Sequence, residues 1–143
     1  MKTDQTESDL RFTKTVCIIG AVFDALTLPP MLLPKVGQVM FGMQNFFPGP
    51  DYRYAMNVGA SLMLGWTLLL LWAARRPVER AGVLLLTAGV VIGLFAAGMS
   101  AVLSGLIPLK NMFPVFVSQT AVTALFLTGY VKVRRLNPGS GSS

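Results

Sequence analysis

The sequence from Val83 to Ile107, VLLLTAGVVIGLFAAGMSAVLSGLI, contains 25 residues and no charged side chain. An α-helix rises by about 1.5 Å per residue, so a helix of this length is long enough to cross the roughly 30 Å hydrocarbon core of a bilayer. The stretch therefore predicts a membrane-spanning helix.

This helix has one face of small residues and one face of bulky residues. The bulky side chains are Leu84, Val91, Phe95, Met99, Val102 and Leu106. The small face is formed by Gly89, Gly93, Ala96, Ala97, Ser100 and Ser104. In lipid, small residues let two helices approach closely, and dispersion and hydrogen bonds then hold them together. We expect the small face to pack on a helix of the same chain first, or alternatively between protomers, with the bulky face toward lipid. The expected helix-packing residues are Gly89, Gly93, Ala96 and Ala97.

The composition favours a membrane protein. Hydrophobic residues make up 53% of the 143 residues and charged residues only 13%, whereas about a quarter of a soluble domain is usually charged. The mean hydropathy is +0.62. Basic residues beside the apolar stretches account for the net charge of +6, because such residues set membrane orientation. We therefore expect the lipid bilayer, and no nucleic acid, as a partner.

Four apolar stretches predict membrane spans within one domain over residues 1–138. The predicted spans are residues 12–33, 54–74, 83–107 and 112–131. Residues 1–11 are polar and are expected to be mobile or to lie at the interface. The Gly/Ser-rich residues 139–143 are interpreted as a linker or a remnant of cloning. Because proline lacks the donor that helix continuation needs, Pro29 and Pro30 are expected to kink or end the first helix near Leu28.

Residues 35–50 are less apolar than the spans. Apolar side chains recur there at three- and four-residue steps, at Val36, Val39, Met40, Met43 and Phe47. This pattern predicts a short amphipathic helix in the interface between the first two spans. The alternative is an ordered loop packed over the helix ends.

Lysine and arginine are distributed unevenly between the two sides of the predicted bundle. Nine of them lie in the N-terminal segment, the 75–80 loop and the C-terminal segment, and three lie in residues 35–53 and at Lys110. Basic residues are enriched on the cytoplasmic side, which places both termini there. The predicted fold is an all-α integral membrane protein of the cell membrane, an up-down-up-down bundle of four transmembrane helices with the short interfacial helix.

Asp24 is the one ionisable residue in the middle of a predicted span. A charged side chain at that depth is energetically costly, so it usually faces the bundle interior or water and often marks a functional site. The helical pattern agrees, because Thr13, Cys17, Gly20 and Thr27 share the face of Asp24. The alternative is a carboxyl that only hydrogen-bonds to a neighbouring helix.

Further polar residues lie outward of the midplane in this orientation. Together with Asp24 they are Thr27, Asn57, Ser61, Ser100, Ser104 and Gln119. They predict an outward-facing polar pocket centred on Asp24 and closed toward the cytoplasm by the apolar inner half of the second span. Alternatively, these groups only form interhelical hydrogen bonds, as hydroxyls in membranes often do.

The residue types exclude several kinds of chemistry. The sequence has no histidine and a single cysteine, Cys17, which excludes His-ligated metals, cysteine clusters and His-based triads. Phosphate-binding loops and dinucleotide fingerprints are also absent. We assign no catalytic residue, no metal and no cofactor, and favour a non-enzymatic role.

Three functions are compatible with these features. The first is binding or passage of a small solute, ion or lipophile through the pocket around Asp24, with an oligomer needed for a pore. The second is an accessory or assembly subunit that docks on a larger membrane protein. The third, ranked last because no second catalytic group lies nearby, is an enzyme acting on a lipid or quinone headgroup.

Overall fold

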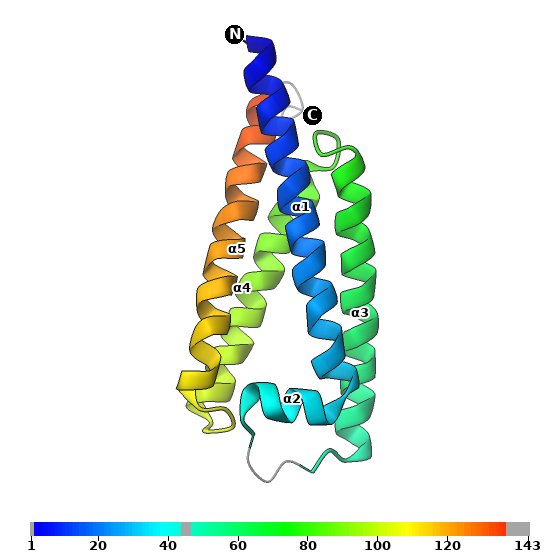
Figure 1. Cartoon of the computed structure of the whole chain (residues 1–143), viewed down its shortest axis with the longest axis vertical. Helices are drawn as coiled ribbons and strands as arrows, with labels where there is room; N and C mark the ends of the chain where they lie inside the picture. Colours follow the sequence, from blue (N-terminus) through cyan, green and yellow to red (C-terminus); the bar gives the residue numbers. More distant parts are fainter. Residues whose placement is uncertain (1, 44–46, 137–143) are drawn as a thin grey trace.

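The computed structural model describes residues 2–43 and 47–136, with side chains from residue 5 onward. Within these ranges the chain forms five helices and no strand. The helices are α1 (Lys2–Leu32), α2 (Pro34–Phe41), α3 (Pro50–Arg75), α4 (Ala81–Leu103) and α5 (Leu109–Leu136), all drawn in Figure 1. Four of them, α1, α3, α4 and α5, are long and apolar enough to cross a membrane. This indicates a multi-pass membrane protein and confirms the all-helical prediction. The predicted linker at residues 139–143 lies outside the described residues.

The first helix begins at Lys2 and not near residue 12, so residues 2–11 are helical, and their place at the interface stays a prediction. Two ion pairs stabilise this polar part of α1. The Arg11 guanidinium lies 2.7 Å from the Glu7 carboxylate one turn away, a spacing that supports a helix. The Lys132 ammonium of α5 donates a 2.8 Å hydrogen bond to Asp9 Oδ1. Residues too polar for a span are therefore held in the helix by charge contacts.

The prolines do not end α1 near Leu28. The helix continues through Pro29 and Pro30 to Leu32, although each proline lacks the N–H that would donate to the preceding turn and its ring crowds the carbonyl there. Leu33 is then extended, with φ −112° and ψ 95°, and Pro34 begins α2. The chain turns a corner at this point, and α2 crosses the end of the bundle (Figure 1).

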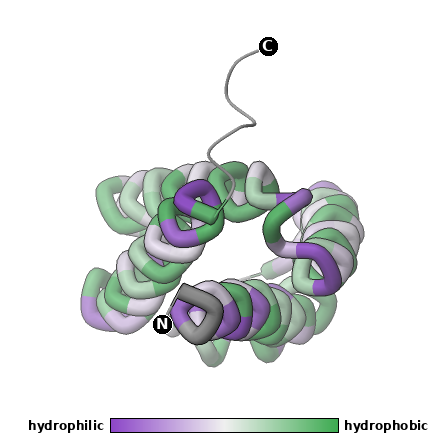
Figure 2. Tube along the Cα trace, turned by 90° about the horizontal axis from the view of Figure 1, so that it is seen from above, coloured by the Kyte–Doolittle hydropathy of each residue, from purple (hydrophilic) through white to green (hydrophobic). Residues whose placement is uncertain are grey.

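The four long helices are arranged as two close pairs, α1 with α3 and α4 with α5. In Figure 1 the chain runs down α1, up α3, down α4 and up α5, so α1 begins and α5 ends at the same end of the bundle. The pairs meet through α1 and α5, whereas the consecutive helices α3 and α4 contact each other little. Viewed from above, hydrophobic residues lie along all the long helices (Figure 2).

The main core lies toward the end of the bundle that contains the two termini. We call it the terminal core, and its buried residues are Val16, Cys17, Ala21, Leu70, Ala73, Leu84, Ala88 and Phe126. Gly20 brings α1 close to α5 there, because a Cβ atom at this position would collide with the Phe126 ring. Polar groups beside the core are paired, as in the 3.2 Å hydrogen bond that Trp66 Nε1 donates to Thr87 Oγ1.

A smaller core lies at the opposite end, around the turn between α4 and α5. It consists of Ile107, Met112 and Phe116, with Phe41 and Met43 of the α2 segment packed against it. Asn111 Nδ2 donates a 2.9 Å hydrogen bond to the Phe41 carbonyl at the end of α2. Gly42 follows in the left-handed region at φ 62°, where a side chain would also collide with the Asn111 amide. Asn111 thus fastens α2 to the α4–α5 pair.

Candidate functional site

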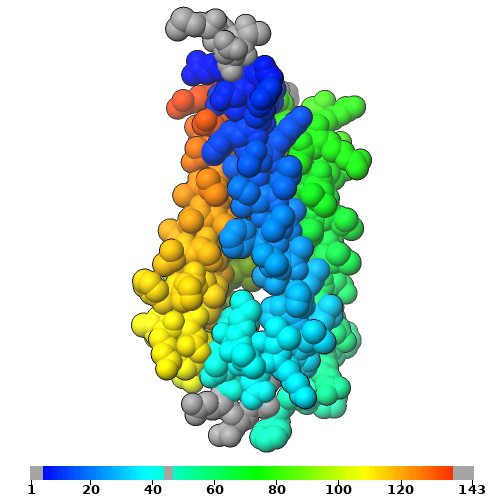
Figure 3. Space-filling view, in the orientation of Figure 1, coloured from blue at the N-terminus to red at the C-terminus, as the bar shows by residue number. Residues whose placement is uncertain are grey.

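A loosely packed layer separates the two cores. We call it the middle layer: the level of α1 between Ala21 and Pro30 and of α5 between Phe116 and Phe126, where neither helix has a fully buried residue. The two stretches lie at a similar level of the bundle, since Gly20 lies against Phe126 and the two helices run in opposite directions, and they diverge from that contact toward α2 in Figure 1. Figure 3 shows the surface hollowed between α1 and α5 just above α2.

Asp24 and Gln119 place side-chain oxygens in the middle layer. Asp24 Oδ2 on α1 and Gln119 Oε1 on α5 are both shielded from solvent, and neither has a hydrogen-bond partner among the described residues. Measured from the Gly20–Phe126 contact, Asp24 lies about 6 Å and Gln119 about 10 Å further toward α2. The two acceptors therefore lie within roughly one helical turn of each other in depth, on two helices that diverge from their contact at Gly20.

Neighbouring hydroxyl groups do not supply the missing donors. Thr27 Oγ1 donates a 2.7 Å hydrogen bond to the Asp24 carbonyl of its own helix. Thr123 Oγ1 donates a 2.8 Å hydrogen bond to the Gln119 carbonyl of its own helix. A hydroxyl has one proton to donate but keeps acceptor lone pairs. The two hydroxyls therefore add acceptors but no free donor to the middle layer, where the Gln119 amide nitrogen is itself a donor.

The structure does not bring the other predicted pocket residues to this layer. Four are exposed, on α3 and at the C-terminal part of α4, namely Asn57, Ser61, Ser100 and Ser104. The Ser61 hydroxyl donates to the Asn57 carbonyl at 2.9 Å, and the Ser104 hydroxyl to the Ala101 carbonyl at 3.0 Å. Both hydrogen bonds stay within one helix, so they do not join neighbouring helices. The two serine hydroxyls also do not line the predicted pocket around Asp24.

The small face of α4 points away from the rest of the chain. Gly89, Gly93, Ala96 and Ala97 are exposed, and a Cβ atom at Gly89 or Gly93 would have no neighbour within 4 Å. The face packed within the chain includes Leu84 and Val91, which were expected to meet lipid. The expectation of packing within the chain is therefore wrong, and packing between protomers stays a prediction. Bulky side chains fill the space beside α5 better than a smooth face would.

Two cavities lie elsewhere, at the corner where α1, α2 and α3 meet. Their volumes are about 420 Å³ and about 300 Å³, and both are lined by Pro34 and Arg53. Asn57, one of the predicted pocket residues, lines the smaller cavity. Arg53 was not among the residues predicted to line a pocket. Its place in a pocket depends on the corner at Leu33, which brings α2 alongside the start of α3.

Only part of the middle-layer chemistry was visible in the sequence. Thr123 was missed, although its four-residue spacing from Gln119 could have indicated it. Across residues 2–43 and 47–136, no group of three or more cysteine, aspartate or glutamate side chains could hold a metal ion. The layer offers acceptor oxygens from a carboxyl, an amide and two hydroxyls, a set that suits hydrogen-bond donors or a positive charge.

Comparison of the chain with protein-family models, with curated proteins and with solved structures finds no match.

Proposed function

We propose that this chain is a small multi-pass membrane protein that binds a small polar or cationic solute in the middle layer between α1 and α5. The observation that carries the proposal is the pair of shielded, unpartnered oxygens on Asp24 and Gln119. A shielded acceptor without a donor destabilises a protein by about 1–3 kcal/mol. Two such acceptors at a similar depth are explained most simply by a ligand that supplies the donors.

The acceptor-rich lining specifies the class of ligand. An amine, an alkali cation or a hydroxylated solute would satisfy both oxygens, whereas an anion would be repelled by the Asp24 carboxylate. Passage across the bilayer would need more than this layer, because the terminal core fills the bundle above it. An oligomer with a pathway between copies is our proposal for transport.

The proposed membrane orientation puts the middle layer within reach of the outside. Nine lysine and arginine residues lie at the end that contains the termini and the 75–80 loop, against three at the α2 end. This bias supports an up-down-up-down bundle in the cell membrane, with cytoplasmic termini and α2 in the outer interface. A solute would then enter from the outer side, past α2.

Thermal unfolding of the purified protein in lipid nanodiscs tests the proposal. Methylammonium, sodium, potassium and glycerol serve as separate probes, and we expect at least one to raise the unfolding temperature of the wild type. Asp24→Leu should abolish this shift. Without any probe, the same variant should be more stable than the wild type by about 1–3 kcal/mol, because a shielded, unpaired acceptor has been removed.

Two further variants sharpen the result. Gln119→Leu should reproduce both effects of Asp24→Leu. Thr128→Val removes an exposed hydroxyl from the same helix and should leave the probe-induced shift intact. A loss of stability in Asp24→Leu without probe would assign the carboxyl a structural partner and contradict the binding role.

A second candidate function rests on the outward small face of α4. An exposed row of Gly89, Gly93, Ala96 and Ala97 lets another helix approach closely, which suits a subunit of a larger membrane assembly. Gly93→Leu should lower the assembly mass measured by light scattering in detergent. Ile92→Leu, a change at an exposed position on the same helix, should not. Equal masses for wild type and Gly93→Leu would remove this candidate.

A further inference from the structure

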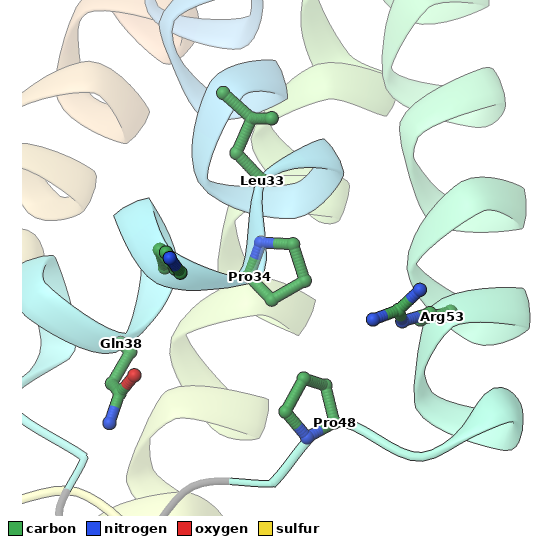
Figure 4. Close-up of a pocket in the computed structure, with 6 residues that line it drawn as sticks. Leu33, Pro34, Gln38, Pro48 and Arg53 are labelled. Carbon is green, nitrogen blue, oxygen red and sulfur yellow. The ribbon is translucent and has the colours of Figure 1, made fainter.

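The corner between α1, α2 and α3 contains two adjoining cavities that share Pro34 and Arg53. We call them together the corner pocket. The larger cavity, about 420 Å³, is lined by Leu33, Pro34, Lys35, Gln38, Pro48 and Arg53. In Figure 4 the Arg53 side chain extends from α3 toward Pro34, between the α2 end and Pro48. The volume is in the range of sites that hold a small molecule or a headgroup.

The charges of the corner pocket are positive and unpaired. The ion pairs between described residues are Glu7–Arg11, Glu79–Arg76 and Asp9–Lys132, so neither Arg53 nor Lys35 has an acidic partner among them. The neighbouring carboxylate, Asp51, is exposed and lies outside the lining of both cavities. A guanidinium binds phosphate through two parallel hydrogen bonds, and an ammonium adds a point charge.

Part of the remaining wall is apolar and continues onto an apolar outer surface, beside the polar side chains of Gln38, Tyr52 and Asn57. Leu33, Pro34 and Pro48 form one side of the larger cavity, and Met31 and Leu32 line the smaller one. Leu32 is 52% exposed and Leu33 is 56% exposed, so the wall extends out of the pocket along α1. A ligand that fits both parts has an anionic head and an apolar tail.

We propose that the corner pocket binds the phosphate of an anionic phospholipid headgroup. Arg53 and Lys35 hold the phosphate oxygens, and Gln38 hydrogen-bonds to the headgroup beyond them. Leu32 and Leu33 contact the glycerol and the first acyl carbons. The site lies at the end of two predicted spans, where headgroups lie beside the protein.

Such a lipid would join parts of the chain that the described residues connect only weakly. Lys35 and Gln38 belong to α2 and Arg53 belongs to α3, so one phosphate would bridge the two helices. Held from both sides, by Asn111 on the α5 side and by the lipid on the α3 side, α2 is fixed across the open end of the bundle.

Delipidated protein in a neutral detergent provides the test. Phosphatidylglycerol, phosphatidylcholine, inorganic phosphate and glycerol 3-phosphate are added separately, and the unfolding temperature and the lipid retained in native mass spectra are measured. We expect phosphatidylglycerol to stabilise the wild type more than any other probe. Arg53→Gln should weaken its binding about tenfold, the effect of one charged hydrogen bond, and Arg53→Lys should restore part of it because the charge returns.

Lys110→Gln is the matched control, because Lys110 is an exposed lysine at the same end of the bundle and lies outside the corner pocket. Normal phosphatidylglycerol binding by this variant supports the proposal. An equal loss in Lys110→Gln, or equal stabilisation by phosphatidylcholine, would overturn it in favour of unspecific contact with lipid. Stabilisation by inorganic phosphate or glycerol 3-phosphate as large as that by phosphatidylglycerol would overturn the lipid in favour of a soluble phosphate.

Discussion

The terminal core and the middle layer share helices α1 and α5 but differ in how these helices pack. In the terminal core, Gly20 lets α1 approach Phe126 closely, and the adjacent Asp9 carboxylate is paired with Lys132. In the middle layer neither helix buries a residue fully, and two shielded oxygens lack partners. Dense packing at one end stabilises the bundle enough to tolerate unsatisfied groups further along, a common division between scaffold and site.

The largest expected effect comes from removing the Phe126 ring at the centre of the terminal core. Phe126 is 1% exposed and Phe113, on the same helix, is 63% exposed. Phe126→Ala should destabilise the protein by about 3–5 kcal/mol because it leaves a cavity. Phe113→Ala should change stability by less than about 1 kcal/mol. Reversible unfolding in mixed micelles measures both, and similar losses would mean that the terminal core does not dominate stability.

Alanine substitutions at two glycines are expected to change the free energy of unfolding by less, and in opposite directions. Gly20→Ala adds a methyl group against the enclosed Phe126 ring and should destabilise by about 1–3 kcal/mol. Gly65 on α3 has no atom within 4 Å of a Cβ position, so Gly65→Ala should stabilise by up to about 1 kcal/mol through helix propensity. Equal signs in unfolding measurements would show that α1 and α5 are not in close contact at Gly20.

The smallest expected effect concerns the bond that fastens α2. Asn111→Ala removes the donor to the Phe41 carbonyl and should weaken the attachment of α2 by about 1 kcal/mol. Hydrogen exchange of the α2 amides should then be about fivefold faster, while amides of the terminal core exchange as before. Lys110→Ala, at the exposed neighbouring residue, is the control. Unchanged exchange in Asn111→Ala would show that α2 is held by its apolar contacts alone.

The sequence predicted the elements of this fold better than their rotation about their own axes. Apolar length alone located the four long helices, because a bilayer requires that length. The helical continuation through residues 2–11 was not predicted, since the partner of Asp9 lies on α5 and no local pattern reveals it. The small face of α4 was assigned inward on packing grounds, yet which face turns in depends on the shapes of all its neighbours.

The candidate site was predicted in part for similar reasons. Asp24 and Gln119 were found because each is polar and lies within an apolar stretch, and both lie in the middle layer. The serine residues were included by depth alone, and depth does not reveal that hydroxyls such as that of Ser61 bond to the preceding turn. Arg53 was missed as a pocket residue because the corner at Leu33 forms only in three dimensions.

The length of α1 has a consequence for whatever meets this protein in the cytoplasm under the proposed orientation. Its 31 residues rise by about 46 Å, well beyond a hydrocarbon core of about 30 Å. The polar first turns would therefore extend beyond the headgroups as a helix, and the Asp9–Lys132 ion pair joins this part of α1 to α5. A fluorophore attached to these first turns would report a change in the tilt of α1 when a ligand binds near the α2 end of the helix.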